Sequence, residues 1–266
     1  MWLLYILFGT CILEFEFSQT LTMELKIYND YNDLSAAAAE IIIDCIKIKP
    51  DALLCFATGH TPKLAYEMVA EKVTKENIDV TRCFMIGLDE WMGISPGNTG
   101  SCHWFLHEYL FTPMKIDLSQ VHLFEALAKN GEAECKKMNK LIAANGIDLM
   151  VVGVGMNGHI GFNEPGTSID SVAHVATLDE TTITVGQKYF SENVSIRKGF
   201  TVGLQQVMDA EKLLMLANGN MKAPVIKTAV EQAVTADFPA SLIQIHKNGT
   251  LMIDHEAASD LKKETG

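Results

Sequence analysis

The run of residues 151–165 holds the side chains best suited to chemistry in this sequence. It reads Val-Val-Gly-Val-Gly-Met-Asn-Gly-His-Ile-Gly-Phe-Asn-Glu-Pro, an apolar strand followed by a turn that carries His159 and Glu164. A histidine near a carboxylate can move protons near neutral pH once the pKa values are tuned. Close approach of the backbone to a ligand is permitted by four glycines, Gly153, Gly155, Gly158 and Gly161. We therefore interpret this run as the floor of an active site.

Part of the same run matches the Gly-x-Gly-x-x-Gly fingerprint of dinucleotide-binding folds. Asp179 follows at about 20 residues, where such folds place an acid that binds ribose. The fingerprint must open a helix, whereas the residues after His159 include Gly161, Pro165 and Gly166, which interrupt helices. We therefore disfavour a nicotinamide cofactor and expect that the protein uses no cofactor.

The composition is that of a soluble globular protein of enzyme size. Of the 266 residues, 48% are hydrophobic and 20% are charged, which fits one α/β domain. The formal net charge of −12 argues against a nucleic-acid partner or an anionic membrane, because both prefer a basic face. A small anionic substrate is still compatible, since a few lysines and amide N–H groups can bind one phosphate.

The cysteines and histidines show no metal-binding pattern. The six cysteines form no Cys-x-x-Cys pair, and their apolar surroundings suit buried, reduced thiols in a cytoplasmic protein. His103 and His107 are spaced to share one helix face, but no third ligand lies nearby and the order is not His-Glu-x-x-His. We therefore expect no metal site.

The start of the chain differs from the rest. Residues 2–13 are largely apolar, but they are too short for a membrane span and no lysine or arginine precedes Lys26. We interpret residues 1–22 as an apolar extension of the gene model outside the fold, with a short membrane anchor as the alternative. Residues 23–266 are then one domain.

Strand and helix patterns alternate along this domain. The predicted strands are 25–28, 52–57, 83–88, 148–154, 172–178, 199–204, 212–217 and 241–246. The predicted helices are 33–49, 61–74, 99–110, 132–145 and 221–234. This alternation predicts an α/β fold of the Rossmann-like type, with a single doubly wound, mostly parallel sheet covered by helices on both faces. In such folds ligands bind at the carboxyl ends of the strands.

Two further strand ends carry reactive or anion-binding groups. Thr58-Gly59-His60-Thr61-Pro62 follows the second strand, and Thr61 is expected to cap the next helix. Amide N–H groups at a helix start favour a phosphate, although the turn could also be only a well-capped connection. Asp89 and Glu90 follow the third strand, where two adjacent acids are costly to bury unless they are paired or used. A solvated surface loop is the alternative for these acids.

Together these strand ends resemble the glucosamine-6-phosphate deaminase/isomerase family. The matching pieces are the Thr-Gly-x-Thr-Pro turn at 58–62, Leu-Asp-Glu-Trp at 88–91 and Asn-Gly-His-Ile-Gly-Phe-Asn-Glu-Pro-Gly at 157–166. They occur in family order, so that the resemblance covers nearly all of the chain from residue 23. It implies that Asp89 is the base that shuttles a proton between C2 and C1, and that His159 opens the sugar ring. Glu164 and Asn157 would assist the histidine.

The resemblance also implies a phosphate site. The residues that it assigns to substrate or phosphate binding are Thr58, Gly59, His60, Thr61, Gly158, Lys188 and Lys222. Lys188 stands where the family commonly has an arginine, so that a charge is retained but a bidentate fork is lost. A departure also occurs at Asn157, where some members have aspartate; asparagine can hold the imidazole only by a hydrogen bond.

The implied activity is conversion of glucosamine 6-phosphate to fructose 6-phosphate and ammonia, within the catabolism of amino sugars such as N-acetylglucosamine. Galactosamine 6-phosphate, giving tagatose 6-phosphate, is an alternative that the run Phe-Pro-Ala-Ser at 238–241 also supports. Two other classes are a 6-phosphogluconolactonase and a non-catalytic sugar-phosphate sensor. The expected partner is a small-molecule sugar phosphate, with a homo-oligomer left open. His174 and Ala176 stand where some members bind an activating phosphate through arginine and lysine, so we expect no such activation.

Overall fold

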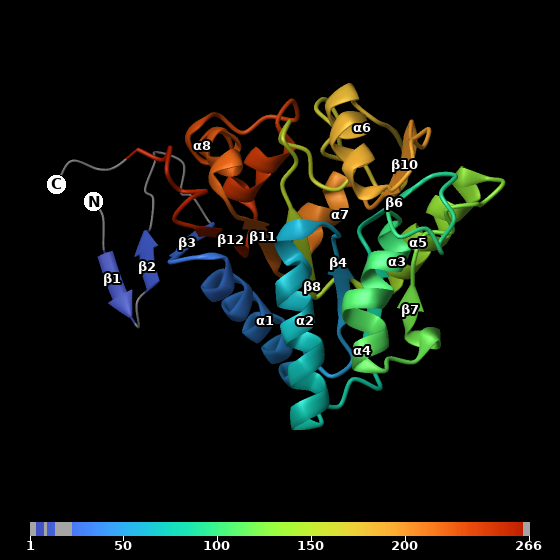
Figure 1. The fold of residues 1–266 in the computed structure, drawn as a ribbon, viewed down its shortest axis with the longest axis horizontal. Helices are drawn as coiled ribbons and strands as arrows, with labels where there is room; N and C mark the ends of the chain where they lie inside the picture. Colours follow the sequence, from blue (N-terminus) through green and yellow to red (C-terminus); the bar gives the residue numbers. More distant parts are fainter. Residues whose placement is uncertain (1–3, 8–9, 14–22, 263–266) are drawn as a thin grey trace.

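Parallel strands form the centre of the structure, a computed structural model that describes residues 4–7, 10–13 and 23–262 (Figure 1). Within these residues, seven parallel strands lie side by side in the order β3 (Glu24–Tyr28), β12 (Gly249–Asp254), β11 (Leu213–Ala217), β8 (Leu149–Gly153), β4 (Leu53–Phe56), β5 (Phe84–Gly87) and β7 (Val121–His122). The predicted mostly parallel sheet is therefore confirmed.

The antiparallel strands β1 (Leu4–Leu7) and β2 (Thr10–Leu13) continue this sheet beyond β3, with β2 paired to β3. Residues 1–3, 8–9 and 14–22 lie outside the described residues. The interpretation of residues 1–22 as an extension outside the fold, and of 23–266 as the domain, stays a prediction.

The order of the strands reverses between β4 and β8. From β4 the chain adds β5 and then β7 on one side, whereas β8, β11 and β12 follow one another on the other side. In a parallel sheet such a reversal leaves a crevice at the carboxyl ends of the two central strands, because the connections leave in opposite directions. The turns after β4 and β8 are the ones in which the sequence predicted a site.

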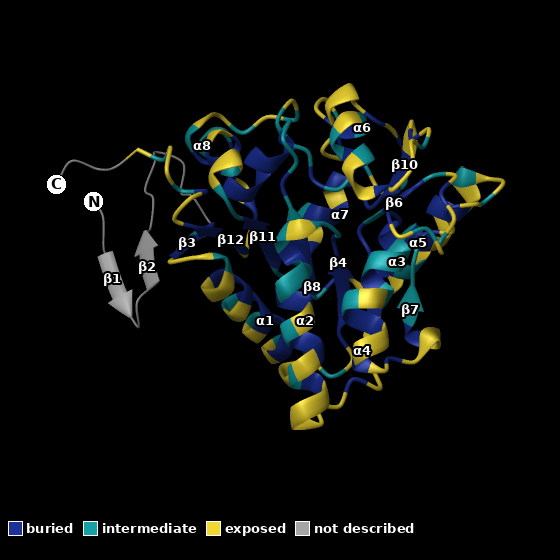
Figure 2. Cartoon of the chain, in the orientation of Figure 1, coloured by how far each residue is buried: buried dark blue, intermediate teal, exposed yellow. Residues whose placement is uncertain are grey.

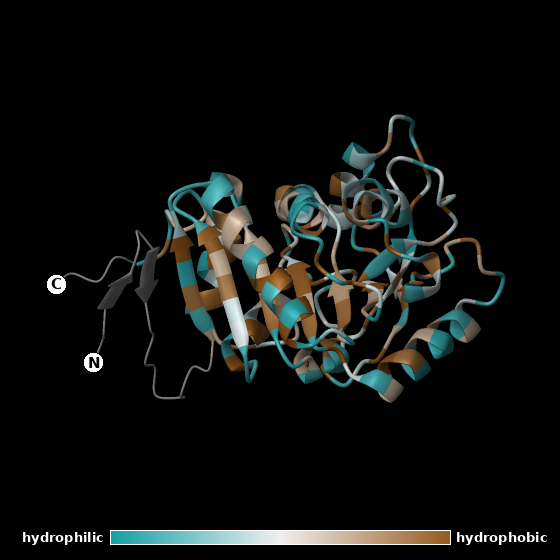
Figure 3. Cartoon of the chain, turned by 90° about the horizontal axis from the view of Figure 1, so that it is seen from below, coloured by the Kyte–Doolittle hydropathy of each residue, from teal (hydrophilic) through white to brown (hydrophobic). Residues whose placement is uncertain are grey.

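Helices cover both faces of the sheet, as predicted for a doubly wound fold (Figure 1). One face packs against α1 (Tyr31–Ile48), α2 (His60–Glu76), α3 (Cys102–Leu106), a π-helical turn (His107–Phe111) and α4 (Thr112–Met114). The other packs against α5 (Gly131–Asn145), α7 (Leu204–Asp209) and α8 (Ala223–Glu231). Leu54 and Phe56 of β4 point to the first face, and Leu53 and Cys55 to the second. The middle strands of the sheet, β12, β11, β8 and β4, are accordingly almost entirely buried and largely apolar, as Figures 2 and 3 show, whereas β7 at the edge is half-buried.

A second, smaller sheet lies beside the carboxyl ends of the central strands. It contains β6 (Asp89–Trp91), β10 (Lys198–Thr201) and β9 (His174–Thr177) in that order, all antiparallel. The strands predicted at 172–178 and 199–204 therefore exist in shorter form, but outside the parallel sheet. Helix α6 (Glu180–Gly186) and a 3-10 turn (Gln187–Tyr189) follow β9 and were not predicted.

The predicted strand at 241–246 is wrong. These residues belong to a 3-10 helix, Pro239–Ile245, and the final strand is β12, which the sequence analysis missed. A short apolar run fits a buried helix as well as a strand, and Pro239 at the start suits the helix. The other predicted elements occur within four residues of their expected ends. None of the helices in the described ranges combines the length and the apolar character that a membrane span requires.

Candidate active site

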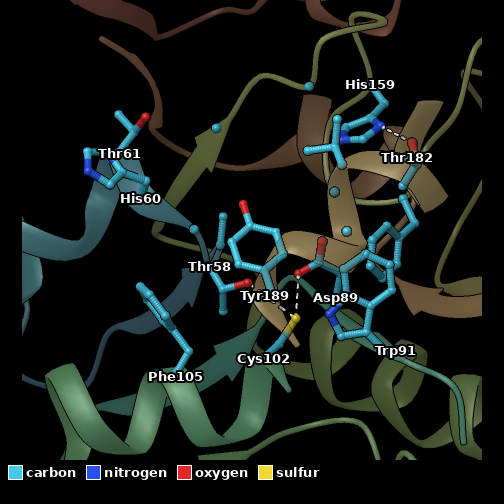
Figure 4. A pocket seen from close by; sticks show the side chains of 18 of the residues that line it. Thr58, His60, Thr61, Asp89, Trp91, Cys102, Phe105, His159, Thr182 and Tyr189 are labelled. Atoms are coloured by element: carbon cyan, nitrogen blue, oxygen red, sulfur yellow. Dashed lines mark hydrogen bonds between the residues drawn. The ribbon is translucent and has the colours of Figure 1, made fainter. Parts of the chain in front are cut away.

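A pocket of about 210 Å³ opens at the carboxyl ends of β4 and β8 (Figure 4). The predicted site residues that line it are Thr58, Gly59, His60, Thr61, Asp89, Asn157, His159 and Lys222. Figure 4 shows His60 and Thr61 on one side of the pocket, and Asp89 and His159 on the opposite side. Glu164 lies behind His159, while Gly158 and Lys188 are outside the lining. The pocket therefore joins all three strand ends that the sequence singled out.

The imidazole of His159 is held at its Nδ1 atom. Glu164 Oε2 lies 3.2 Å from Nδ1, and the hydroxyl of Thr182 on α6 lies 2.9 Å from the same atom. Asn157 Nδ2 donates to Glu164 Oε2 at 2.8 Å, and the backbone N–H of Asp179 donates to Oε1 at 3.2 Å. A carboxylate at Nδ1 favours the tautomer with the proton there. The other ring nitrogen, Nε2, is thereby left as a proton acceptor.

Glycine is needed at two positions of the loop that carries His159. A Cβ atom on Gly155 would lie 2.3 Å from His159 Nε2, so that the ring can pack over the backbone only because this side chain is missing. Gly158 has a φ of +81°, and a Cβ there would lie 2.4 Å from the Phe238 ring. Gly158 thus shapes the loop from behind, instead of facing the pocket as predicted for a substrate-binding residue.

Glu164 remains ionised despite its position beneath the histidine. Only 8% of it is exposed, and burial raises its pKa. Hydrogen bonds with His159, Thr182 and Asn157, together with the charge on His159, outweigh burial and hold the pKa below its usual value. A carboxylate in this state can stabilise positive charge on the imidazole, and Glu164 is thus suited to the supporting role that the resemblance implied.

Asp89 and Glu90 have different environments although they are adjacent in β6. Burial raises the pKa of Asp89 to about 7, and the Glu90 carboxylate adds to this rise. Glu90 is 1% exposed, and its carboxylate accepts backbone N–H groups of Trp91 at 2.8 Å, Cys102 at 3.0 Å and His103 at 2.7 Å. Burial raises the pKa of Glu90 to about 7 as well, against these three donors. Asp89 lines the pocket and Glu90 anchors the start of α3.

The turn after β4 presents an uncapped helix start. The prediction that Thr61 caps α2 is wrong, because the N-cap is Gly59, with a φ of 123° and no side-chain cap. The Thr61 hydroxyl donates instead to Asn218 Oδ1 at 2.6 Å, and the Thr58 hydroxyl donates to Cys102 Sγ at 3.2 Å. The first N–H groups of an α-helix lack partners within the helix. The start of α2 therefore offers backbone donors and a positive dipole end to an anion.

The two lysines that were predicted to bind phosphate differ in position. Lys222 lines the pocket, and its Nζ donates to the carbonyl of Val154 at the end of β8, at 2.6 Å. Burial lowers the pKa of Lys222. Lys188 is exposed on the 3-10 turn after α6, and its neighbour Tyr189 lines the pocket in its place. Of the two, only Lys222 is already placed to meet a ligand.

Several lining residues were not predicted. They are mostly aromatic or hydroxyl-bearing: Trp91, Phe105, Phe162, Thr182 and Tyr189, together with Cys102. Tyr189 carries its hydroxyl toward Gly59, since a Cβ on that glycine would lie 3.5 Å from it. Trp91 belongs to the Leu-Asp-Glu-Trp motif, so its place directly after Asp89 and Glu90 could have predicted a position in the pocket. No sequence pattern could have predicted Thr182 or Cys102, because their partners His159 and Asp89 are remote in sequence.

The described residues include no group of three or more His, Cys, Asp or Glu side chains arranged to hold a metal ion. His103 and His107 instead stack ring on ring, with centroids 4.7 Å apart, and burial lowers the pKa of both. Cys45, Cys55, Cys83, Cys102 and Cys135 are free thiols.

Comparison with known proteins identifies the family. The family profile described as glucosamine-6-phosphate isomerases/6-phosphogluconolactonase matches residues 30–253. The chain belongs to this family. It is 38% identical over 244 residues to a glucosamine-6-phosphate deaminase of Thermoanaerobacter sp. (strain X514), covering 91% of this chain and 96% of that protein. It is 37% identical over 239 residues to glucosamine-6-phosphate deaminase 1 of Bacillus subtilis (strain 168), covering 89% and 99%. The resemblance drawn from three motifs is thereby confirmed, and the chain is a member of an enzyme family that acts on sugar phosphates.

Solved structures of the same family agree. A structure of a monomeric glucosamine-6-phosphate deaminase superimposes with a TM-score of 0.85 at 36% identity, covering 89% of this chain and 99% of that one. The 6-phosphogluconolactonase of Trypanosoma brucei follows with a TM-score of 0.74 at 18% identity, over 90% and 98%, and shares the fold alone. The monomeric state of the first structure gives no support to a homo-oligomer.

Proposed function

We propose that this protein is a glucosamine-6-phosphate deaminase, which converts glucosamine 6-phosphate and water to fructose 6-phosphate and ammonia. The observation that carries the proposal is the content of one pocket. The Asp89 carboxyl group, with a pKa that burial raises to about 7, the imidazole of His159, which Glu164 supports from behind, and an uncapped helix start all face the same space. The deaminase relatives that cover nearly the whole chain support the same activity.

The phosphate of the substrate would bind at the start of α2. The backbone N–H groups there and the Lys222 ammonium supply the positive potential that a dianion requires. The Thr61 hydroxyl could add a donor only by releasing Asn218, because its hydrogen is already donated. Binding energy at this end fixes the reacting end of the sugar on the opposite side, near Asp89 and His159.

His159 would open the sugar ring. Nδ1 is engaged by Glu164 and Thr182, so Nε2 can take the proton of the C1 hydroxyl and return it to the ring oxygen as the ring bond breaks. The imidazolium that forms in between is stabilised by the Glu164 carboxylate, which replaces the charge that Asn157 lacks. The product of this step is the open-chain aldehyde.

Asp89 would then transfer a proton between carbons. Its carboxylate removes the proton from C2 of the substrate in its ammonium form, and one ammonium proton moves to the aldehyde oxygen, which leaves a neutral enolamine with a hydroxyl on C1 and the amino group on C2. The resulting carboxylic acid returns the proton to C1, so that C2 becomes an iminium ion. Water adds to this iminium carbon and the nitrogen leaves as ammonium, which yields the ketose phosphate. A base with a pKa of about 7 suits both halves of this transfer at neutral pH.

Galactosamine 6-phosphate is the second candidate substrate. Its support is the run 238–241, in which Phe238 packs against Gly158 behind the catalytic loop and Ala240 donates its N–H to the Gly158 carbonyl at 2.8 Å. This motif therefore shapes the loop that carries His159. Retention of Asp89 and His159 favours an enzyme over a non-catalytic sensor, and the intact Asn-Glu-Pro run at 163–165 favours a deaminase over a lactonase.

The proposed setting is the catabolism of amino sugars in the cytoplasm. Its support within the described residues is five free cysteine thiols, which suit a reducing compartment.

The decisive test is ammonia release from glucosamine 6-phosphate and galactosamine 6-phosphate, assayed side by side with hydrolysis of 6-phosphogluconolactone. The proposal expects the highest kcat/KM with glucosamine 6-phosphate and no lactone hydrolysis above the spontaneous rate. A higher kcat/KM with galactosamine 6-phosphate would move the assignment to its epimer. Lactone hydrolysis without ammonia release would overturn the reaction class.

A further inference from the structure

Cys102 lies between two groups that the proposed reaction uses. Its Sγ atom is 3.7 Å from Asp89 Oδ1, and it accepts the hydrogen bond of the Thr58 hydroxyl at 3.2 Å. Figure 4 draws both contacts, which run from the turn after β4 through the sulfur to Asp89. Cys102 is 4% exposed as a residue and lines the pocket. A thiol thus touches the proposed catalytic base directly.

The start of α3 fixes the position of this thiol. Ser101 is the N-cap, and its hydroxyl accepts the backbone N–H of Trp104 at 3.0 Å. The Glu90 carboxylate accepts the backbone N–H groups of Cys102 and His103. Glu90 therefore binds the backbone of the same helical turn whose Cys102 side chain contacts Asp89. This closed arrangement leaves the sulfur little freedom to move away.

The direction of the hydrogen bonds follows from the chemistry of the groups. Burial raises the pKa of the Cys102 thiol well above its ordinary value, and the charges on Asp89 and Glu90 raise it further, so the thiol keeps its proton. The sulfur already accepts from the Thr58 hydroxyl. The S–H group can then donate its one proton to a carboxylate. The Cys102 side chain interacts with Glu90 as well as Asp89, and Asp89 Oδ1 is the acceptor that lies 3.7 Å from the sulfur.

The electrostatic surroundings of Asp89 give this weak donor its importance. Groups that interact electrostatically with Asp89 include Glu90, Cys55, Tyr66, Cys102 and Tyr189. All are acids, and none carries a positive charge. Among the interactions that set the pKa of Asp89, the hydrogen bond from Cys102 is the one that favours the ionised carboxylate.

We propose that Cys102 is a positioning residue whose S–H group holds Asp89 Oδ1, so that the second carboxylate oxygen faces the substrate. This inference rests on the proposed function, since it gives Asp89 the role of base. Cys102 acts through Asp89 and does not itself contact the reacting carbons. The thiol also joins the base to Thr58, and thereby to the turn that is proposed to receive the phosphate.

The test compares Cys102→Ala and Cys102→Ser with the wild-type enzyme. The carboxyl carbon of Asp89 is titrated by 13C NMR without substrate, and kcat and KM are measured across pH. Cys102→Ala should raise the pKa of Asp89 by about half a unit, because a donor to the charged form is lost. Its kcat at pH 7 should fall roughly five- to ten-fold with KM little changed. Cys102→Ser, which keeps a donor, should recover most of both losses.

The matched control is Cys135→Ala, which removes another buried thiol, on α5 and outside the pocket. It should leave the pKa of Asp89 and kcat unchanged. An Asp89 pKa and kcat in Cys102→Ala equal to those of the wild type would overturn the inference. So would equal damage in Cys102→Ala and Cys102→Ser without any pKa change, which marks a packing role.

A further measurement needs only the folded wild-type protein and Cys102→Ser. The Raman S–H band that disappears in Cys102→Ser belongs to Cys102, and in the wild type it should shift as Asp89 ionises. A band that is insensitive to this titration would contradict the contact. The NMR and Raman readouts do not require turnover. Absence of ammonia release by the wild-type protein would therefore refute the proposed function while these readouts still decide the contact.

Discussion

Replacing Asp89 with asparagine tests the proposed chemistry most sharply, because it replaces one carboxylate oxygen with an NH2 group and leaves the side-chain volume almost unchanged. The carboxylate acts on a carbon-bound proton, so its loss should abolish turnover while KM stays within a few-fold of the wild type. Positioned general bases contribute roughly 10²–10⁴ in rate, and we therefore expect kcat below about a hundredth of the wild-type value.

The pH dependence of the wild-type enzyme follows from the same residue. Burial and the Glu90 charge raise the pKa of Asp89 to about 7, and only the ionised form can accept a proton. Activity should therefore be lost as pH falls through about 7, and kcat/KM should rise roughly ten-fold between pH 6 and pH 8. An acid limb near the usual aspartate pKa of about 3.9 would refute the role of burial in tuning the base.

The stability of the same variant gives an independent check. A folded-state pKa raised by burial means that the native state binds more protons than the unfolded state between about pH 4 and pH 7, so the Asp89 carboxylate destabilises the fold as pH rises through this window. Asp89→Asn should therefore melt at a higher temperature than the wild type at pH 8, and the gain should vanish near pH 4.

The control for both measurements is Asp170→Asn, the same change at an exposed position outside the pocket. It should leave kcat and the melting temperature unchanged. Residual kcat in Asp89→Asn above about a hundredth of the wild type would refute the assignment of the base.

Three further predictions concern binding, the imidazole and regulation. Lys222→Ala should raise KM for the sugar phosphate roughly ten- to a hundred-fold, since it removes a charge-assisted contact. Lys188→Ala should raise KM less, because Lys188 is exposed. If calorimetry shows that a variant binds inorganic phosphate as tightly as the wild type, the replaced lysine is not in the site. Thr182→Val should lower kcat several-fold at unchanged KM, because the hydroxyl that orients His159 is lost, and Thr182→Ser should restore kcat. Wild-type kinetics of Thr182→Val would show that Glu164 alone orients His159. Rate curves should be hyperbolic and insensitive to N-acetylglucosamine 6-phosphate, because His174 and Ala176 cannot bind its phosphate as an arginine and a lysine would; a sigmoidal curve that this effector makes hyperbolic would contradict the prediction.

The parallel sheet and the three reactive strand ends could be predicted from the sequence because both depend on local patterns. Residues 53–56 and 149–153 are continuous apolar runs, which mark strands that are buried on both faces. Such strands must lie side by side, and their carboxyl ends then meet. The spacing of His159 and Glu164 along the loop was also local, which is why their contact was predictable.

Other features depend on residues that are distant in sequence. The Thr182 hydroxyl contacts His159 Nδ1 only because α6 packs beside the pocket, and no local sequence pattern predicts that helix. The strand predicted at 241–246 was wrong for a different reason. Its apolar residues suit burial in either a helix or a strand, and β12 is recognised only by its pairing with β3 and β11. Tertiary contacts therefore decide what periodicity leaves ambiguous.

The activity itself is tested most directly by identifying the products of glucosamine 6-phosphate by 1H NMR. The proposed mechanism predicts fructose 6-phosphate and ammonium in equal amounts from the wild-type protein, and neither product from Asp89→Asn. Unchanged glucosamine 6-phosphate after incubation with the folded wild-type protein would contradict the central claim, and so would equal product formation by the Asp89→Asn variant.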